Sequence, residues 1–272
     1  ITTAFVDASG DVLVSKQNKF THKDYRKDYV WLDSDTYGET FTVAPPYEPI
    51  RVSAASGKLG VYGREYTMAG ALPSQMVSKE RELLARPVTF VAVIDGKEHM
   101  AKVTKPFAIE GKPTDARVTF EGEYAVAGMT LGLGGELFYD GAVTYTLEAA
   151  PGPDAQAVER LYLAVPVREE VAEAMWTTRG GMAGLTKMVS EMPSGDGAIW
   201  DSDGVSDFTP YVGLCDDERA IQWYADNDHD WVLGDDAPCT QLVRKNGALE
   251  IQVNFVRRKS HGEGFKAVFG LI

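Results

Sequence analysis

The sequence predicts an almost all-β protein, built as a large antiparallel β-sandwich with very little helix. Its main signal is a set of turn pairs between β-prone runs: Asp95-Gly96, Asp140-Gly141 and Asn246-Gly247. Such pairs favour tight type I′ hairpins because both turn residues can take a positive φ. Hairpins join antiparallel strands, so a fold of alternating strands and helices is not expected. A length of 272 residues allows either one large sandwich or two smaller packed sandwich subdomains.

The run from 248 to 256 indicates how the strands are expected to be buried. Apolar residues at the odd positions 249–255 alternate with Glu250, Gln252 and Asn254. Because successive side chains of a strand point to opposite faces, this pattern predicts one buried face and one solvated face. The other expected strands are 59–62, 65–68, 88–94, 97–103, 116–120, 124–127, 136–139, 143–148, 160–167, 221–225 and 241–245.

Helix is expected in only two short segments. In 169–176, Val171 and Met175 are four residues apart, as are Ala172 and Trp176, which is the spacing of one helix face. Residues 79–85 are the second segment, expected to form a single helical turn.

A proline-rich connector at 44–49 divides the chain. Pro45, Pro46 and Pro49 restrict φ and disfavour helix, so this stretch is expected to be stiff and extended. Residues 1–44 are therefore expected to form an N-terminal segment, either separate or part of a first sandwich. Residues 45–272 are expected to form the main β-sandwich domain.

The charge excludes some partners. The net charge is −13. Phosphate groups of nucleic acids and anionic lipids attract basic surfaces, so neither a nucleic acid nor an anionic membrane surface is expected as a partner. Thirteen acidic residues and one basic residue, Arg219, lie between Glu191 and Thr240. No apolar run reaches the ~18 residues of a membrane span, so no membrane insertion is expected.

No cofactor or metal site is expected. The glycine-rich stretch 130–135 lacks the Gly-Lys-Ser/Thr ending of a phosphate loop, and its glycines predict a bulge or tight bend instead. The Asp residues at 226, 228 and 230 alternate as in a calcium loop, but Trp231 stands where such a loop has glycine. Cys215 and Cys239 either form a disulfide or remain two thiols.

No catalytic residue is expected either. Glycosidase chemistry would require a pair of carboxylates, and the candidate pairs are Asp201 with Asp203 and Asp216 with Glu218. Adjacent acidic residues are also common in turns, and the four histidines lie far apart without metal spacing.

Aromatic residues in the acidic stretch are the more informative set. A sugar can pack its C–H face on an aromatic ring while Asp, Asn or Gln binds its hydroxyl groups, although large aromatic side chains often belong to the core. Trp223 alternates with Ile221 and is expected in the core. The candidate sugar-binding residues are Trp200, Tyr211, Tyr224, Trp231 and Asp228.

Several segments also occur in a familiar order between Trp31 and Phe269. They include Pro45-Pro46-Tyr47-Glu48-Pro49, Gly63-Arg64-Glu65-Tyr66, Leu72-Pro73-Ser74-Gln75, Leu83-Leu84-Ala85-Arg86-Pro87, Trp200-Asp201-Ser202, Phe208-Thr209-Pro210-Tyr211 and Ala220-Ile221-Gln222-Trp223-Tyr224-Ala225. In this order they resemble the N-terminal, non-catalytic β-domain of proteins similar to glycoside hydrolase family 123. Cys215 departs from the small residue expected at its position.

The resemblance implies an accessory module of a secreted, periplasmic or cell-surface enzyme. The family is associated with β-N-acetylgalactosaminidase activity, and its catalytic Asp-Glu pair lies in a (β/α) barrel C-terminal to this domain. The expected partners are thus a glycan and that barrel, and this chain alone is expected to be inactive. Three alternatives are a stand-alone carbohydrate-binding module, a structural or adhesion domain, and a complete hydrolase that uses the acidic stretch.

Overall fold

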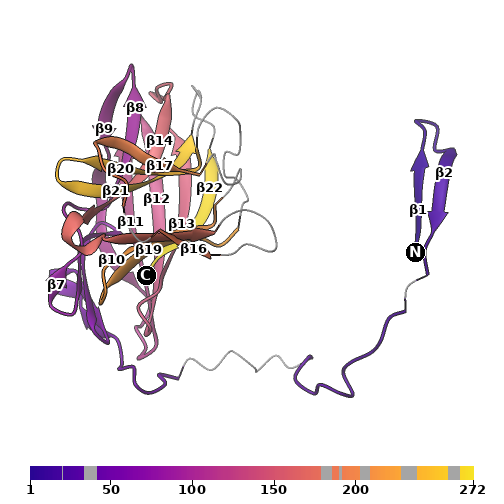
Figure 1. Cartoon of the computed structure of the whole chain (residues 1–272), viewed down its shortest axis with the longest axis horizontal. Coiled ribbons are helices and arrows are strands. Elements are labelled where there is room, and N and C mark those ends of the chain that lie inside the picture. The colour runs from indigo at the N-terminus through magenta and orange to yellow at the C-terminus, as the bar shows by residue number, and fades with distance from the viewer. Residues whose placement is uncertain are drawn as a thin grey trace. The chain divides into compact units, whose positions relative to one another are not determined.

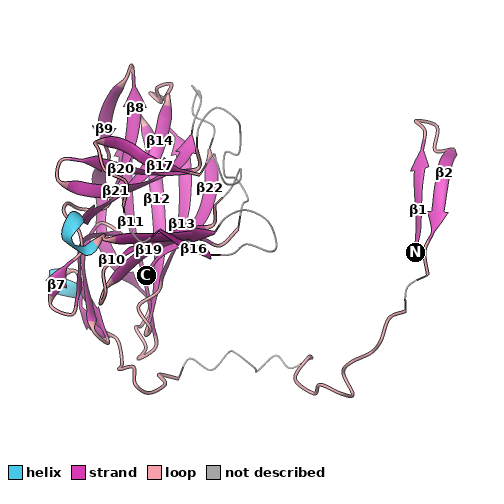
Figure 2. Ribbon diagram, in the orientation of Figure 1, coloured by secondary structure: helices cyan, strands magenta, loops and turns pink. Residues whose placement is uncertain are grey.

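The computed structural model describes residues 1–19, 21–33, 42–178, 186–189, 192–202, 209–227, 238–256 and 264–272. It divides into two compact units, Ile1–Phe41 and Thr42–Ile272. The first unit contains one hairpin of β1 (Thr2–Val6) and β2 (Val12–Gln17). The second unit is built almost entirely of antiparallel strands (Figures 1 and 2). The predicted all-β fold is confirmed.

The largest sheet of the second unit has nine strands, and every neighbouring pair is antiparallel. In spatial order its strands are β10 (Lys102–Glu110), β11 (Arg117–Val126), β12 (Met129–Phe138), β13 (Val143–Pro151), β22 (Phe265–Leu271), β19 (Ala220–Ala225), β18 (Tyr211–Cys215), β15 (Ala174–Thr178) and β16 (Thr186–Val189).

Two smaller sheets complete this unit. The six-stranded sheet has the order β17 (Gly197–Asp201), β20 (Thr240–Lys245), β21 (Ala248–Val256), β14 (Arg160–Arg168), β8 (Thr89–Ile94) and β9 (Lys97–Met100). The five-stranded sheet has the order β3 (Arg51–Ser53), β4 (Lys58–Val61), β5 (Arg64–Ala69), β6 (Leu72–Ser78) and β7 (Arg81–Glu82).

Aromatic pairs join the six-stranded and nine-stranded sheets into a sandwich. The ring centroids of Phe90 on β8 and Tyr124 on β11 are 5.6 Å apart, and those of Phe255 on β21 and Phe269 on β22 are 6.0 Å apart. All four side chains are buried in one continuous core to which the five-stranded sheet also contributes. The second unit is therefore one large sandwich.

Two predicted tight turns form as expected. Asp95 and Gly96 have φ values of 48° and 71°, and Asn246 and Gly247 have 53° and 70°. The Asp140-Gly141 turn is different: only Gly141 has a positive φ, and the Phe138 amide bonds to the Ala142 carbonyl across a longer loop. The side chain of Asp140 accepts a hydrogen bond from the Ala142 amide, which favours this wider turn.

The predicted helices are wrong. Residues 169–176 form a short 3₁₀ helix, η2 (Glu169–Val171), and then enter β15. Met175 and Thr177 of this strand are buried, and Trp176 lies on the opposite face. Within 79–85, Lys79 and Glu80 take positive φ and form a hairpin turn into β7. A second 3₁₀ helix, η1 (Ala54–Ser56), precedes β4. No helix in the described ranges has the length and apolar character needed to cross a membrane.

The glycine-rich stretch 130–135 is also not a bend. It lies inside β12, whose register with β11 and with β13 is unbroken. A Cβ atom at Gly135 would lie 2.2 Å from the Phe120 ring, so this glycine makes room for a core aromatic residue. The strand thus uses glycine for close packing.

Candidate functional site

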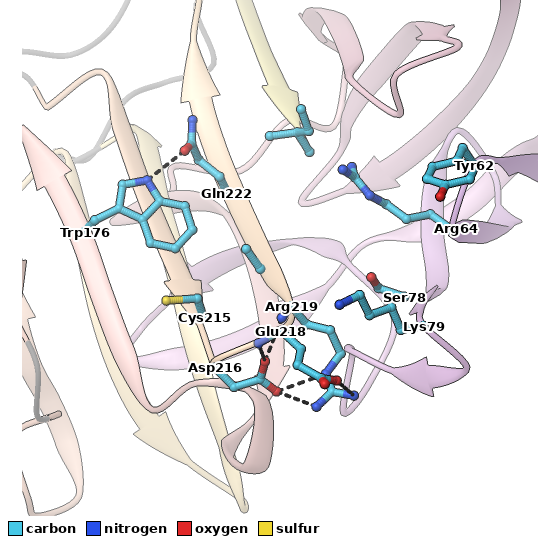
Figure 3. Close-up of a pocket in the computed structure, with 13 residues that line it drawn as sticks. Tyr62, Arg64, Ser78, Lys79, Trp176, Cys215, Asp216, Glu218, Arg219 and Gln222 are labelled. Carbon is cyan, nitrogen blue, oxygen red and sulfur yellow. Dashed lines mark hydrogen bonds and ion pairs between the residues drawn. The ribbon is translucent and has the colours of Figure 1, made fainter. Parts of the chain in front are cut away.

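A cavity of about 620 Å³ opens between the five-stranded sheet and one end of the nine-stranded sheet. Tyr62 and Arg64 of the β4–β5 hairpin face Trp176 on β15 and Gln222 on β19 across it (Figure 3). The remaining lining residues are Gly63, Ser78, Lys79, Cys215, Asp216, Glu218, Arg219, Ala220 and Ile272.

Trp176 presents an ordered indole ring on the outer face of the sheet. Its Nε1 donates a 2.8 Å hydrogen bond to Oε1 of Gln222 (Figure 3). Trp176 pairs with Gly213 on β18, and Gly213 pairs with Gln222, so the three residues form one row across three strands. The ring lies over Gly213, where a Cβ atom would be 2.1 Å from the indole. A fixed flat ring beside an amide is suited to bind the apolar face and a hydroxyl group of a sugar.

Gly213→Ala should displace this ring, because the added methyl group occupies its position. We expect a loss of about 1–3 kcal/mol in the free energy of unfolding, as for other overpacked sites. Gly134→Ala is the matched control, since a Cβ atom at this strand glycine meets nothing within 4 Å. Urea unfolding of both variants is the measurement. Equal stability of the two would contradict the close packing of Trp176 on Gly213.

The acidic turn at the base of the cavity is a structural ion pair. Asp216 Oδ1 accepts hydrogen bonds from the amides of Glu218 and Arg219 at 2.8 and 2.7 Å. Its Oδ2 lies 2.9 and 2.8 Å from Nε and Nη2 of Arg219. Burial raises the pKa of Asp216, but these hydrogen bonds and the guanidinium outweigh burial, so the pKa is below its ordinary value. Asp216 therefore stays ionised near neutral pH and is unsuited to be a proton donor.

The surroundings of Cys215 disfavour the thiolate, which is the nucleophilic form of cysteine. Burial, followed by Asp216 and Asp217, raises the pKa of the Cys215 thiol, so the thiol stays protonated near neutral pH. Cys215 belongs to β18 and Cys239 immediately precedes β20 of the other large sheet, and no disulfide joins them. Among the described residues, no three His, Cys, Asp or Glu side chains gather as a metal site would require.

The sequence-predicted sugar-binding residues divide into three groups. Tyr211 and Tyr224 pair across β18 and β19, two residues along from the Gly213–Gln222 pair, and so lie on the same face of the sheet as Trp176 and Gln222. Trp200 lies on β17 of the six-stranded sheet and packs against the core. Trp231 and Asp228 lie outside the described residues, as does Asp203. The structure thus brings two predicted residues close to a third, Trp176, that the sequence reasoning assigned to a helix.

Tyr224 is held much like Trp176. Its ring lies over Gly270 on β22, where a Cβ atom would be 2.1 Å away, and its hydroxyl is 3.1 Å from that of Thr144. We call Trp176, Tyr211, Gln222 and Tyr224 together the aromatic face. Only Trp176 and Gln222 of this set line the cavity.

Residues 55–190, half of the chain, match the family model described as glycoside hydrolase 123, third domain. The chain belongs to this family. The resemblance to glycoside hydrolase family 123 is thus confirmed, and the family description numbers the matched domain as the third. No curated protein matches the chain in sequence.

Solved structures share only a distant likeness with this glycoside hydrolase 123 domain. The Slr1438 protein of Synechocystis sp. PCC 6803 is 11% identical with a TM-score of 0.44, over 85% of this chain and 96% of that one. A putative aldose 1-epimerase of Escherichia coli K12 is 10% identical with a TM-score of 0.39, over 82% and 97%. The α-N-acetylgalactosaminidase NagBb of Bifidobacterium bifidum is 12% identical with a TM-score of 0.41, over 82% and 35%. Values this low support no conclusion about function.

Proposed function

We propose that this domain is an accessory module of a secreted glycoside hydrolase that acts on glycans containing N-acetylgalactosamine. It braces the catalytic barrel of the same polypeptide, and its cavity lines one side of the glycan cleft. The observation that carries the proposal is the row formed by Trp176, Gly213 and Gln222, which holds an indole ring and an amide at a cavity wall. Membership of the glycoside hydrolase 123 family supports a glycan as the ligand.

The carboxylates of the cavity favour binding over hydrolysis. Among the described residues that line it, only Asp216 and Glu218 carry side-chain carboxylates. Glycoside hydrolysis generally needs two carboxyl groups, of which one is protonated and donates to the leaving oxygen. Asp216 is tied to Arg219 and two amides, and the side chain of Glu218 is 60% exposed. The environment of Asp216 lowers the pKa of its carboxyl, whereas an acid catalyst requires a raised one.

Trp176→Ala should weaken glycan binding by about tenfold, which corresponds to about 1.4 kcal/mol. The reason is that the substitution removes the ring on which the sugar packs. Isothermal titration of the 272-residue chain with an oligosaccharide rich in N-acetylgalactosamine measures the change. Trp200→Phe is the matched control, because Trp200 belongs to the other large sheet and should leave the affinity unchanged.

Two further measurements separate bracing from binding. The chain alone should not hydrolyse an aryl N-acetyl-β-galactosaminide. Hydrolysis by the chain that is lost in the variant Glu218→Gln would overturn the accessory role. The barrel of the complete polypeptide should unfold at a lower temperature when residues 45–272 are deleted. Saturable binding without an effect on the barrel would favour a stand-alone carbohydrate-binding module that uses the same aromatic face.

A further inference from the structure

The N-terminal hairpin exposes an unusual amount of apolar surface. Phe5, Val6, Val12, Leu13 and Val14 are between 55% and 71% exposed. Phe5 pairs with Val14 across the two strands, and Val6 pairs with Val12 after a shift in the register. Because Phe5 and Val6 are consecutive residues of one strand, their two pairs lie on opposite faces, and both faces of the hairpin carry apolar groups.

Such a hairpin is not expected to be stable by itself. A two-stranded hairpin in water is marginal, and three or more strands with a covered apolar face are normally needed. β1 and β2 form a sheet of only two strands, so each has one edge without a neighbouring strand among the described residues. Unpaired edges and exposed apolar faces are the features through which a strand pair joins a larger sheet.

The chain carries a second exposed apolar group just after the hairpin. Tyr25, Tyr29 and Trp31 are 47–54% exposed, with neighbouring ring centroids 6.0 and 5.9 Å apart. All of these residues belong to the unit Ile1–Phe41. The family match begins only at residue 55, and the family description numbers the matched domain as the third. A domain numbered third implies that proteins of this family carry another domain N-terminal to it.

We infer that residues 2–17 are the last two strands of the preceding domain of the same polypeptide, paired along an edge of that domain's sheet. Their apolar side chains fill its core, and the segment up to the Pro45-Pro46 connector links it to the sandwich Thr42–Ile272. This inference rests on the family membership and the exposed hairpin and is independent of glycan binding.

Hydrogen exchange measured by mass spectrometry tests the inference on two proteins. One is the 272-residue chain, and the other is the polypeptide that also carries the domain encoded ahead of Ile1. In the chain alone, the amides of residues 2–17 should exchange at nearly the rate of an unfolded peptide. In the longer polypeptide they should exchange at least about 100-fold more slowly, because they then belong to a packed sheet.

A variant pair assigns the effect to the apolar contact. Phe5→Ser with Val14→Ser, made in the longer polypeptide, should remove the protection and lower the melting temperature of the preceding domain. Thr3→Ser with Lys16→Gln, at the next-but-one register pair, should leave both unchanged. Melting of the sandwich Thr42–Ile272 should not change in either variant, which excludes general unfolding.

Three results would overturn the inference. The first is the absence of any domain ahead of Ile1 in the gene. The second is rapid exchange of the hairpin in both proteins. The third is slow exchange of the hairpin amides in the 272-residue chain. Exchange that slows further as the protein concentration rises would mean that the hairpin pairs with a second copy. Slow exchange at every concentration would mean that the hairpin docks within the chain itself.

Discussion

Asp216→Ala should destabilise the sandwich by about 3–5 kcal/mol, the usual cost of removing one partner from a buried ion pair. The side chains of Asp216 and Arg219 are only 6% and 10% exposed. Without the carboxylate, Glu218 at 3.8 Å is the remaining acidic partner of the guanidinium among the described residues, and the amides of Glu218 and Arg219 lose their acceptor. Urea unfolding at pH 7 measures the loss.

Two controls separate the ion pair from the general effect of a mutation. Asp217→Ala changes the exposed neighbour and should cost no more than about 0.5 kcal/mol. The double variant Asp216→Ala/Arg219→Ala should cost clearly less than the sum of the two single variants, because the two residues act as one unit. Strict additivity would show that the pair contributes no coupling energy.

The same pair predicts how stability depends on pH. The pKa of Asp216 is lowered in the folded state, so its stabilising contribution is complete above the unfolded pKa of about 3.9. The contribution is lost as the pH falls from there through the folded pKa. The stability gap between the natural chain and Asp216→Asn should therefore be constant from pH 7 to pH 5 and narrow below about pH 4. A gap that persists at lower pH would contradict this assignment.

Local signals in the sequence predict much of the fold. The hairpins at Asp95-Gly96 and Asn246-Gly247 form because the conformation that they require is set by two adjacent residues. Most strand runs are likewise found where β-branched and aromatic residues cluster. The site is harder to predict. Val171 and Met175 have helical spacing, but residues 174–177 pair with β18, a partner more than thirty residues away. Pairing over such a distance leaves no trace in local spacing.

One signal could have revealed Trp176. Gly213 stands in the middle of a short strand of larger residues, where glycine has a cost unless another group approaches closely. The glycine indicates such an approach, although it does not indicate which side chain makes it. Residue type and region predict Tyr211 and Tyr224 as candidates, and the pairing of β18 with β19 explains why they lie together.

The alternation along β21 predicts one of its two faces correctly and the other wrongly. Residues 249–255 at odd positions face the core, as predicted, but the polar face is not solvated. Glu250, Gln252 and Asn254 are only 3%, 2% and 1% exposed. Alternation shows which residues share a face, whereas burial of the second face depends on what covers it. The buried polar side chains are instead satisfied by one another and by cations.

Arg160 is central to this buried polar layer. Its Nε and Nη2 each donate a 2.5 Å hydrogen bond, to Asn254 Oδ1 and Gln252 Oε1. The guanidinium carbon also lies 4.3 Å from the centre of the Tyr162 ring. In the same layer, Lys245 Nζ lies 3.1 Å from Oε1 of Glu250, and Arg86 Nη2 lies 3.2 Å from its Oε2. Each buried acceptor thus depends on a particular donor.

Arg160→Met should therefore destabilise the sandwich by about 2–4 kcal/mol. The loss has two causes, because a buried acceptor is left unsatisfied and the cation–π contact with Tyr162 is removed. Asn254 Oδ1 loses the donor described for it, whereas Gln252 Oε1 keeps the amide of Gln241 at 2.8 Å. Arg81→Met on exposed β7 is the matched control and should change stability by at most about 0.5 kcal/mol. The double variant Arg160→Met/Asn254→Leu should cost less than the sum of the two single variants, because donor and acceptor are then removed together. The single variant Asn254→Leu is part of the comparison because it also removes the 2.8 Å hydrogen bond from Asn254 Nδ2 to the Pro238 carbonyl. Strictly additive costs would mean that Arg160 acts through its packing on Tyr162 and not through its bond to Asn254.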